Sequence, residues 1–255
     1  MFRIFGIRLA VHVSFLLLLA YVAWEGWAES GWPGVAWSLG LMALLFVCIV
    51  LHELGHSLTA RRFGIAVPRI LLLPIGGMAE FSTIPREPRR ELLITLAGPA
   101  VNFAIVLALL PFVPTPHFSA DAVVELSPRG TGQFLLWVNL VMGGFNLLPV
   151  FPMDGGRILR ALLATRWSYL RATFWAASIG KVLAVIGVAV MVFVWPNPLA
   201  AILFAFIFIA GDLEYRMLKR REEENAQWEM LIRRLYGNAD DGDRGVAVNV
   251  LHGPN

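Results

Sequence analysis

Two histidines and a glutamate form an H-E-x-x-H pattern between positions 52 and 56. On a helix, residues four apart lie on the same face, one turn from each other, so His52 and His56 can both reach one zinc ion. Glu53 is turned by about 100° from His52 and can take a proton from water beside the metal without binding the metal. The pattern therefore predicts a hydrolytic zinc centre.

The same pattern arises by chance in about 1% of chains of this length, and a histidine in a helix is most often only hydrogen-bonded. The surroundings favour the metal. The pattern lies in a long apolar segment, and an ionisable side chain costs roughly 2.5–3.5 kcal/mol or more at the centre of a bilayer. Three such side chains so close together are explained if a metal ion satisfies them.

Asp154 is the predicted third ligand, because a catalytic zinc has three protein ligands and leaves a position for water. It follows Pro149 and Pro152, which cannot lie in an unbroken helix. At membrane depth, a broken helix indicates the lining of a cavity, where protein or water satisfies the backbone. The alternative for Asp154 is an interfacial acid paired with Arg157.

Composition places these residues in a membrane protein. Of the 255 residues, 58% are hydrophobic and 15% are charged, and the mean hydropathy is +0.68. A soluble domain has about 45–50% apolar and 25% charged residues, and its helices need polar faces. The isoelectric point of about 9.4 does not indicate a nucleic-acid partner, because the basic residues lie in short loops between apolar segments.

We predict an all-α polytopic membrane protein with about six transmembrane helices. Between the second and third, residues 65–73 and 78–83 read as strands separated by Pro74, Gly76 and Gly77, which indicates a short membrane-associated β-hairpin. Six apolar runs come near the ~20 residues that a helix needs to cross a bilayer, at about 9–27, 36–60, 91–113, 132–153, 173–195 and 197–215.

Arginine and lysine residues set the orientation. The loops on one side contain nearly all of them, and the loops on the opposite side contain only Arg129. The positive-inside rule then places both termini in the cytoplasm, which requires an even number of spans. We divide the chain into a transmembrane domain, residues 1–215, and a cytoplasmic tail, residues 216–255, which is a charged helix to about 236 and disordered beyond.

The two motifs together resemble the site-2 protease family of intramembrane zinc metalloproteases. The family pattern is H-E-x-x-H on one span and N-x-x-P-x-x-P-x-D-G on a later one, and positions 146–155 match the second part. The six-span layout is similar to the subgroup that includes the protease activating a sporulation sigma factor. The resemblance implies a multi-pass protein of a prokaryotic cell membrane, here with neither a CBS pair nor a PDZ domain.

The resemblance also implies the roles of individual residues. It assigns one Zn²⁺ per chain to His52, His56 and Asp154. It implies that Glu53 is the general acid and base of peptide-bond hydrolysis and that Asn146 is a catalytic polar group near the scissile carbonyl. The implied partners are the lipid bilayer and a membrane-protein substrate cut in or near a transmembrane segment, with no nucleic acid.

Three further residues are candidates for substrate binding. The hairpin that contains Gly76 and Gly77 can offer a strand edge to an extended substrate, or it can be an ordinary packed hairpin. Asn102 follows Ala97-Gly98-Pro99, which also resembles the family, and it can form a hydrogen bond between helices near the site.

Two other functions compete with proteolysis. A metal-ion transporter would use histidine and aspartate within the membrane to pass an ion, but here the polar groups cluster at one depth. A pseudo-protease would bind membrane segments without cutting them, and the intact motif residues argue against it. The roles of His12, of Cys48 and of the tail stay open, as does the formation of a homo-oligomer.

Overall fold

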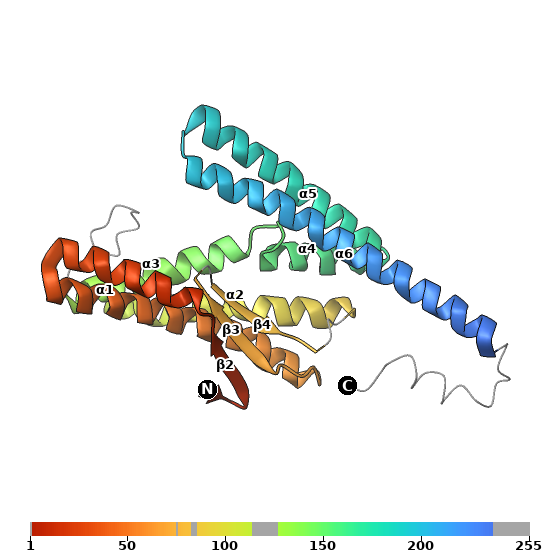
Figure 1. Ribbon diagram of the computed structural model, residues 1–255, viewed down its shortest axis with the longest axis horizontal. Coiled ribbons are helices and arrows are strands. Elements are labelled where there is room, and N and C mark those ends of the chain that lie inside the picture. Colours follow the sequence, from red (N-terminus) through yellow and green to blue (C-terminus); the bar gives the residue numbers. More distant parts are fainter. Residues whose placement is uncertain (1, 75, 83–85, 114–126, 237–255) are drawn as a thin grey trace.

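The computed structural model describes residues 2–74, 76–82, 86–113 and 127–236. The chain is mostly helical, with one small sheet packed beside the helices (Figure 1). The helices are α1 (Ser14–Arg62), α2 (Pro88–Leu109), α3 (Pro128–Asn146), α4 (Asp154–Ala164), α5 (Tyr169–Ala189) and α6 (Pro198–Tyr236). Short turns η1 (Leu110–Phe112) and η2 (Val190–Val194) continue α2 and α5.

The long α1 is a helical hairpin. Its 49 residues are interrupted at Ser30 and Gly31, whose backbone angles are not helical, and Pro33 follows at once. The two halves then run back along each other: Gly26 and Gly34 approach so closely that a Cβ on either would clash with the backbone of the other. These halves correspond to the first two predicted spans, but the first half begins at Ser14 rather than near residue 9.

A four-stranded sheet corrects the all-α prediction. Strands β1 (Phe2–Ile4) and β2 (Ile7–Val11) form a hairpin at the N-terminus, and β3 (Arg69–Leu73) and β4 (Gly76–Glu80) form the second hairpin. The order is β1-β2-β3-β4, with β2 and β3 parallel. The apolar residues of β2 resemble the start of a helix in sequence, and only the pairing with β3 makes them a strand.

The predicted hairpin after the second span exists, but its boundaries differ. Leu73 pairs with Gly76 and Leu72 with Gly77, so both glycines belong to β4 rather than to the turn. The strand ends at Glu80, before the predicted end at residue 83, which lies outside the described residues. Because β4 is the last strand in the order β1-β2-β3-β4, it is an edge strand of the sheet.

The fourth predicted span, 132–153, ends early. Helix α3 stops at Asn146, and residues 147–153 form turns that lead into α4. Pro149 and Pro152 in this connection supply no backbone N–H for helical hydrogen bonds. As a result Asp154 is not at the end of a span but in the first turn of a separate short helix.

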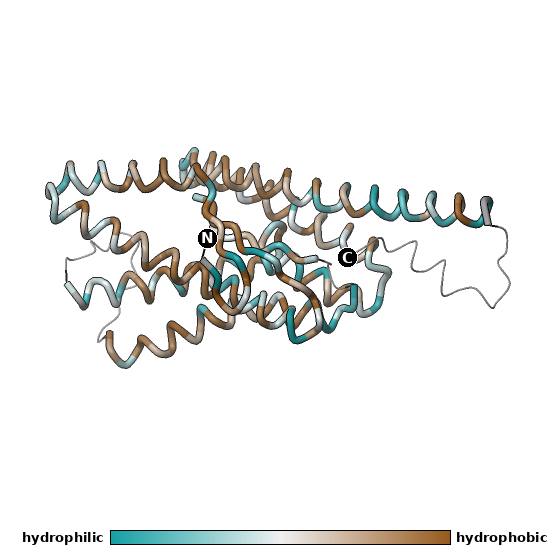
Figure 2. The backbone as a smooth tube through the Cα atoms, turned by 60° about the horizontal axis from the view of Figure 1, so that its bottom comes forward, coloured by the Kyte–Doolittle hydropathy of each residue, from teal (hydrophilic) through white to brown (hydrophobic). Residues whose placement is uncertain are grey.

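Four helices in the described part of the chain are long and apolar enough to cross a membrane: Ser14–Arg62, Pro88–Phe112, Tyr169–Val194 and Pro198–Arg234. At most 33% of their most apolar windows is buried inside the protein, and helices so apolar are exposed in this way when lipid surrounds them. The last helix continues without a break into the charged tail, so its apolar half is followed by a polar half (Figure 2). The predicted disordered end, from residue 238, lies outside the described residues.

Candidate metal centre

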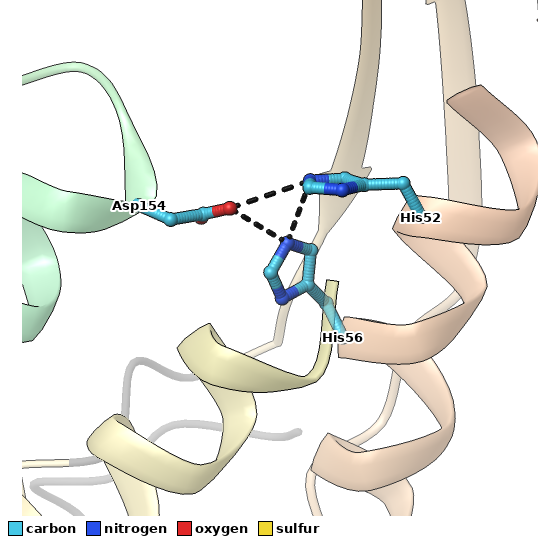
Figure 3. A group of neighbouring side chains, drawn as sticks. All are labelled: His52, His56 and Asp154. Carbon is cyan, nitrogen blue, oxygen red and sulfur yellow. Dashed lines mark hydrogen bonds and ion pairs between the residues drawn. The ribbon is translucent and has the colours of Figure 1, made fainter. Parts of the chain in front are cut away.

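Three side chains from two distant helices converge at one point (Figure 3). Nε2 of His52 lies 3.3 Å from Oδ2 of Asp154, and Nε2 of His56 lies 3.2 Å from the same oxygen. The two Nε2 atoms are 3.1 Å apart. Both histidines are buried, being 4% and 7% exposed. The structure thus brings together the three residues that the sequence predicts as metal ligands.

The opposite nitrogen of each ring binds a hydrogen-bond acceptor. Nδ1 of His56 lies 2.8 Å from the carbonyl oxygen of Ile94, and Nδ1 of His52 lies 2.6 Å from Oδ1 of Asn102. Each neutral ring therefore carries its proton on Nδ1 and directs the lone pair of Nε2 inward. Two lone pairs and a carboxylate oxygen that face one another repel unless a cation lies between them.

A zinc ion fits between these atoms. Ligand atoms about 2.0–2.1 Å from a tetrahedral zinc are roughly 3.3 Å from one another, close to the observed 3.1–3.3 Å. Oδ2 of Asp154 is buried without a hydrogen-bond partner among the described residues, as expected for an oxygen that binds a metal. Within the described ranges, His52, His56 and Asp154 are the one group of three such side chains placed to hold an ion.

The centre lines a cavity of about 680 Å³. Glu53 lies in its wall beside the histidines, Asn146 lines it from the end of α3, and Gly76 and Gly77 line it from β4. The fifth candidate, Asn102, is fully buried and is not among the lining residues. Four of the five predicted catalytic and substrate-binding residues therefore share one space with the metal ligands.

A buried ionic cluster holds the helix that carries Asp154. Arg160, on α4, is 2% exposed and donates to Oε1 of Glu91 on α2 from Nε at 2.9 Å and from Nη2 at 2.5 Å. Its Nη1 donates to Glu214 on α6 at 2.8 Å. The guanidinium also lies 5.2 Å from the ring centroid of Phe151, in the connection that precedes α4. Arg160 therefore ties α4 and its connection to two spanning helices.

Sequence reasoning missed two buried polar residues near the site, Arg160 and Asn139. Arg160 reads as one more loop arginine, and Asn139 is a single amide in an apolar segment that belongs to no motif. One signal was available for Asn139, since a polar side chain within a span is costly and needs a partner. For Arg160 the signal was Glu91, an acid in the first turn of an apolar helix.

Comparison with known proteins gives consistent matches. The sequence model of Peptidase family M50 matches residues 40–119 and 117–194. Zinc metalloprotease MJ0392 of Methanocaldococcus jannaschii is 38% identical over 219 residues, which cover 86% of this chain and 61% of that protein. Stage IV sporulation protein FB of Bacillus subtilis is 27% identical over 214 residues, which cover 82% of this chain and 68% of that protein.

A solved structure is also similar. The site-2 protease from Methanocaldococcus jannaschii matches with a TM-score of 0.58 and 38% sequence identity, covering 84% of this chain and 94% of that one. The match covers most of both chains, so it is not confined to the two motifs.

Proposed function

This chain belongs to Peptidase family M50, and on that premise we propose that it is an intramembrane zinc metalloprotease that hydrolyses peptide bonds in or near the transmembrane segments of membrane proteins. One observation carries the proposal: the three ligand atoms and the Glu53 carboxylate line the same cavity. A site that only stored or passed a metal would have no use for an acid beside the first histidine that is not itself a ligand.

The side chains divide the chemistry among them. Zinc, when held by His52, His56 and Asp154, polarises the peptide carbonyl and makes a nearby water more acidic. Glu53 removes a proton from the attacking water and afterwards delivers it to the leaving amine. The water oxygen forms the C–O bond to the carbonyl carbon as Glu53 takes its proton, and the C–N bond breaks as Glu53 gives that proton to the amine nitrogen, so no redox partner is needed.

Asn146 is placed to assist the carbonyl oxygen. Its Nδ2 donates to the carbonyl oxygen of Met142, one turn earlier in α3, at 3.0 Å. An amide nitrogen carries two hydrogens, so one remains for the substrate carbonyl as negative charge develops on its oxygen. A donor already held by its own helix needs little reorganisation during the reaction.

The substrate binds as an extended strand beside β4. β4 is an edge of the sheet, and Gly76, Gly77 and Met78 line the cavity that holds the metal centre. A transmembrane helix hides its carbonyls in internal hydrogen bonds, so a substrate must unwind before attack. Pairing with β4 replaces those bonds by bonds to a strand edge. Trp137 and Phe145 of α3 line the same cavity and favour apolar substrate side chains.

The proposed protease crosses the membrane six times. β2 precedes α1, and β3 follows it, and the two strands pair side by side, so both ends of α1 lie at one face of the bilayer and α1 crosses twice. The apolar helices α2, α5 and α6 add three crossings. The less apolar α3, whose 19 residues come near the length that a crossing needs, is the sixth. We further propose that both termini lie in the cytoplasm, as the positive-inside rule suggests for this distribution of arginine, in a prokaryotic cell membrane as the family resemblance implies. Residues 1–215 are then the protease domain and 216–255 a cytoplasmic tail.

The test is the variant Glu53→Gln, co-expressed with a panel of single-span membrane proteins as reporters. We expect cleavage to fall about 100-fold or more, because the general base is lost, while one zinc per chain stays bound. Glu229→Gln, an exposed change on the tail, is the control and should cleave as the wild type does. Cleavage by Glu53→Gln at the wild-type rate would overturn the assignment. Zinc flux through proteoliposomes without any cleavage would favour the transporter.

A further inference from the structure

We infer that Asn139 is a positioning residue of the metal centre, which acts through Asn102 to keep the proton of His52 on Nδ1. The inference rests on the proposed zinc site but not on the reaction performed there. Asn139 lies on α3 and is neither a ligand nor a lining residue of the cavity.

Two hydrogen bonds connect Asn139 to His52 through Asn102, and two more hold Asn139 in place. Oδ1 of Asn102 lies 2.6 Å from Nδ1 of His52, and Nδ2 of Asn102 donates to Oδ1 of Asn139 at 2.9 Å. Nδ2 of Asn139 in turn donates to the carbonyl oxygen of Leu135 at 2.8 Å and to Sγ of Cys48 at 3.2 Å. Both asparagines are 0% exposed, so no water competes for these bonds.

The carbonyl of Leu135 determines the donor-to-acceptor direction of this series of hydrogen bonds. The carbonyl oxygen of Leu135 can only accept a hydrogen bond, so Nδ2 of Asn139 must face it and Oδ1 must face Asn102. Asn102 then has to present its Nδ2 to Asn139 and its Oδ1 to His52. Against an acceptor, His52 places its proton on Nδ1, and Nε2 remains free to bind the metal.

Asn102 alone does not fix this direction. An amide can turn over and exchange its oxygen and nitrogen positions, which would offer an N–H group to Nδ1 of His52. The ring would then carry its proton on Nε2, the atom that faces Asp154 and His56, and could not bind zinc. Asn139 removes this freedom, because a turned amide at Asn102 would set two oxygens against each other in a buried space.

Cys48 has a part in the same arrangement. Its Sγ lies on α1, one turn before His52, and accepts the second hydrogen of Asn139 Nδ2. Both hydrogens of that nitrogen are thus used, and Asn139 is held between α3 and α1. The buried thiol, 4% exposed, is explained as a support for Asn139 rather than as a metal ligand.

The test measures zinc affinity of the full-length protein in detergent by competition with a chromophoric chelator. Asn139→Leu removes the acceptor that orients Asn102, and we expect zinc to bind about 10- to 100-fold more weakly, as when other groups that orient a ligand are lost. Asn139→Ala makes the same removal with less bulk and serves if the leucine does not fit. Thr173→Val is the control: it deletes a hydroxyl that is equally buried but bonds only within α5, and its zinc affinity should be unchanged.

A second substitution separates orientation from packing. Aspartate at position 102 has two acceptor oxygens and cannot offer an N–H group in either orientation. Asn102→Asp should therefore restore most of the zinc affinity that Asn139→Leu loses, whereas it would restore nothing if Asn139 only filled space. Wild-type affinity in both Asn139 variants, or no recovery in the double variant, would overturn the inference. Zinc binding without proteolysis in the wild type would instead count against the proposed function alone.

Discussion

His56 packs directly against the backbone of Gly98. A Cβ added to Gly98 would lie 2.1 Å from Nε2 of His56 and 2.4 Å from Cε1. The same face of α2 supplies the carbonyl of Ile94, which accepts from Nδ1 of the same ring. One turn of α2 therefore holds His56 both by a hydrogen bond and by the absence of a side chain.

Gly98→Ala should disable the metal site without unfolding the helices. The methyl group must displace the His56 ring, so we expect zinc affinity to fall by at least about tenfold, measured by chelator competition. Gly40→Ala, also in a helix but with no atom within 4 Å of the added Cβ, should bind zinc as the wild type does. Unchanged affinity in Gly98→Ala would show that His56 is not held as described.

Gly77→Ala should impair catalysis and spare the metal. A Cβ at this position of β4 would lie 2.8 Å from Cγ of Glu53 and 3.0 Å from Cγ2 of Ile49, so Glu53, the proposed general base, must move. Displacement of a reacting group by about 1 Å can cost about 100-fold in rate. We expect kcat to fall about 10- to 100-fold at unchanged zinc content. The control is Gly144→Ala, where the added Cβ meets nothing within 4 Å.

Arg160→Met should destabilise the fold, because it leaves Glu91 buried and unpaired. Loss of one partner of a buried ion pair costs about 3–5 kcal/mol, and we expect this decrease in the free energy of unfolding in detergent micelles. The double variant Arg160→Met with Glu91→Leu should regain most of it. Arg216→Met breaks the ion pair with Asp212 at a guanidinium that is 70% exposed, and it should cost less than about 1 kcal/mol. Equal decreases in the free energy of unfolding for Arg160→Met and Arg216→Met would contradict the stabilising role assigned to Arg160.

The second hairpin should loosen in acid. Hydrogen bonds from Arg69, at 2.7 and 2.6 Å, hold the pKa of Glu80 below its ordinary value of 4.5. The unfolded hairpin therefore binds the proton first, so the stabilisation is complete above pH 4.5 and is lost as the pH falls through the lower pKa of the folded state. We expect the amides of β3 and β4 to exchange faster in Glu80→Gln than in the wild type at pH 7. The two proteins should converge only once the pH has fallen below the lowered pKa of Glu80 in the folded state, and a difference that persists there would have another cause.

Local patterns predicted the parts of the site that depend on local geometry. On a helix, the four-residue spacing places His52 and His56 on the same face. The two prolines before Asp154 predicted an irregular connection there. That Asp154 meets the histidines does not follow from spacing alone. It was inferred from the need for a third ligand and from the prolines that break the helix before it, and the family pattern supported it. The structure shows the packing of α4 on α2 that produces it.

Contacts between residues far apart in the chain could not be predicted from local sequence patterns. Residues 7–11 are as apolar as the start of a span, and they form β2 because β3, far along the chain, lies beside them. Asn139 and Arg160 have partners on other helices, at separations of 37 and 69 residues, which no periodic pattern encodes. The early end of α3 was foreseeable from Pro149, but the apolar residues up to Met153 masked it.

The four strands of the described residues and the histidines His52 and His56 lie within the first 80 residues of the chain, whereas Asp154 comes far later. A ribosome therefore releases the complete sheet and two of the three zinc ligands before the last ligand has been made. The edge proposed to receive a substrate can assemble while the nascent protein is still unable to cut. If the proposed assignment holds, a nascent chain that has not yet reached Asp154 lacks one zinc ligand and so cannot cleave the membrane proteins around it.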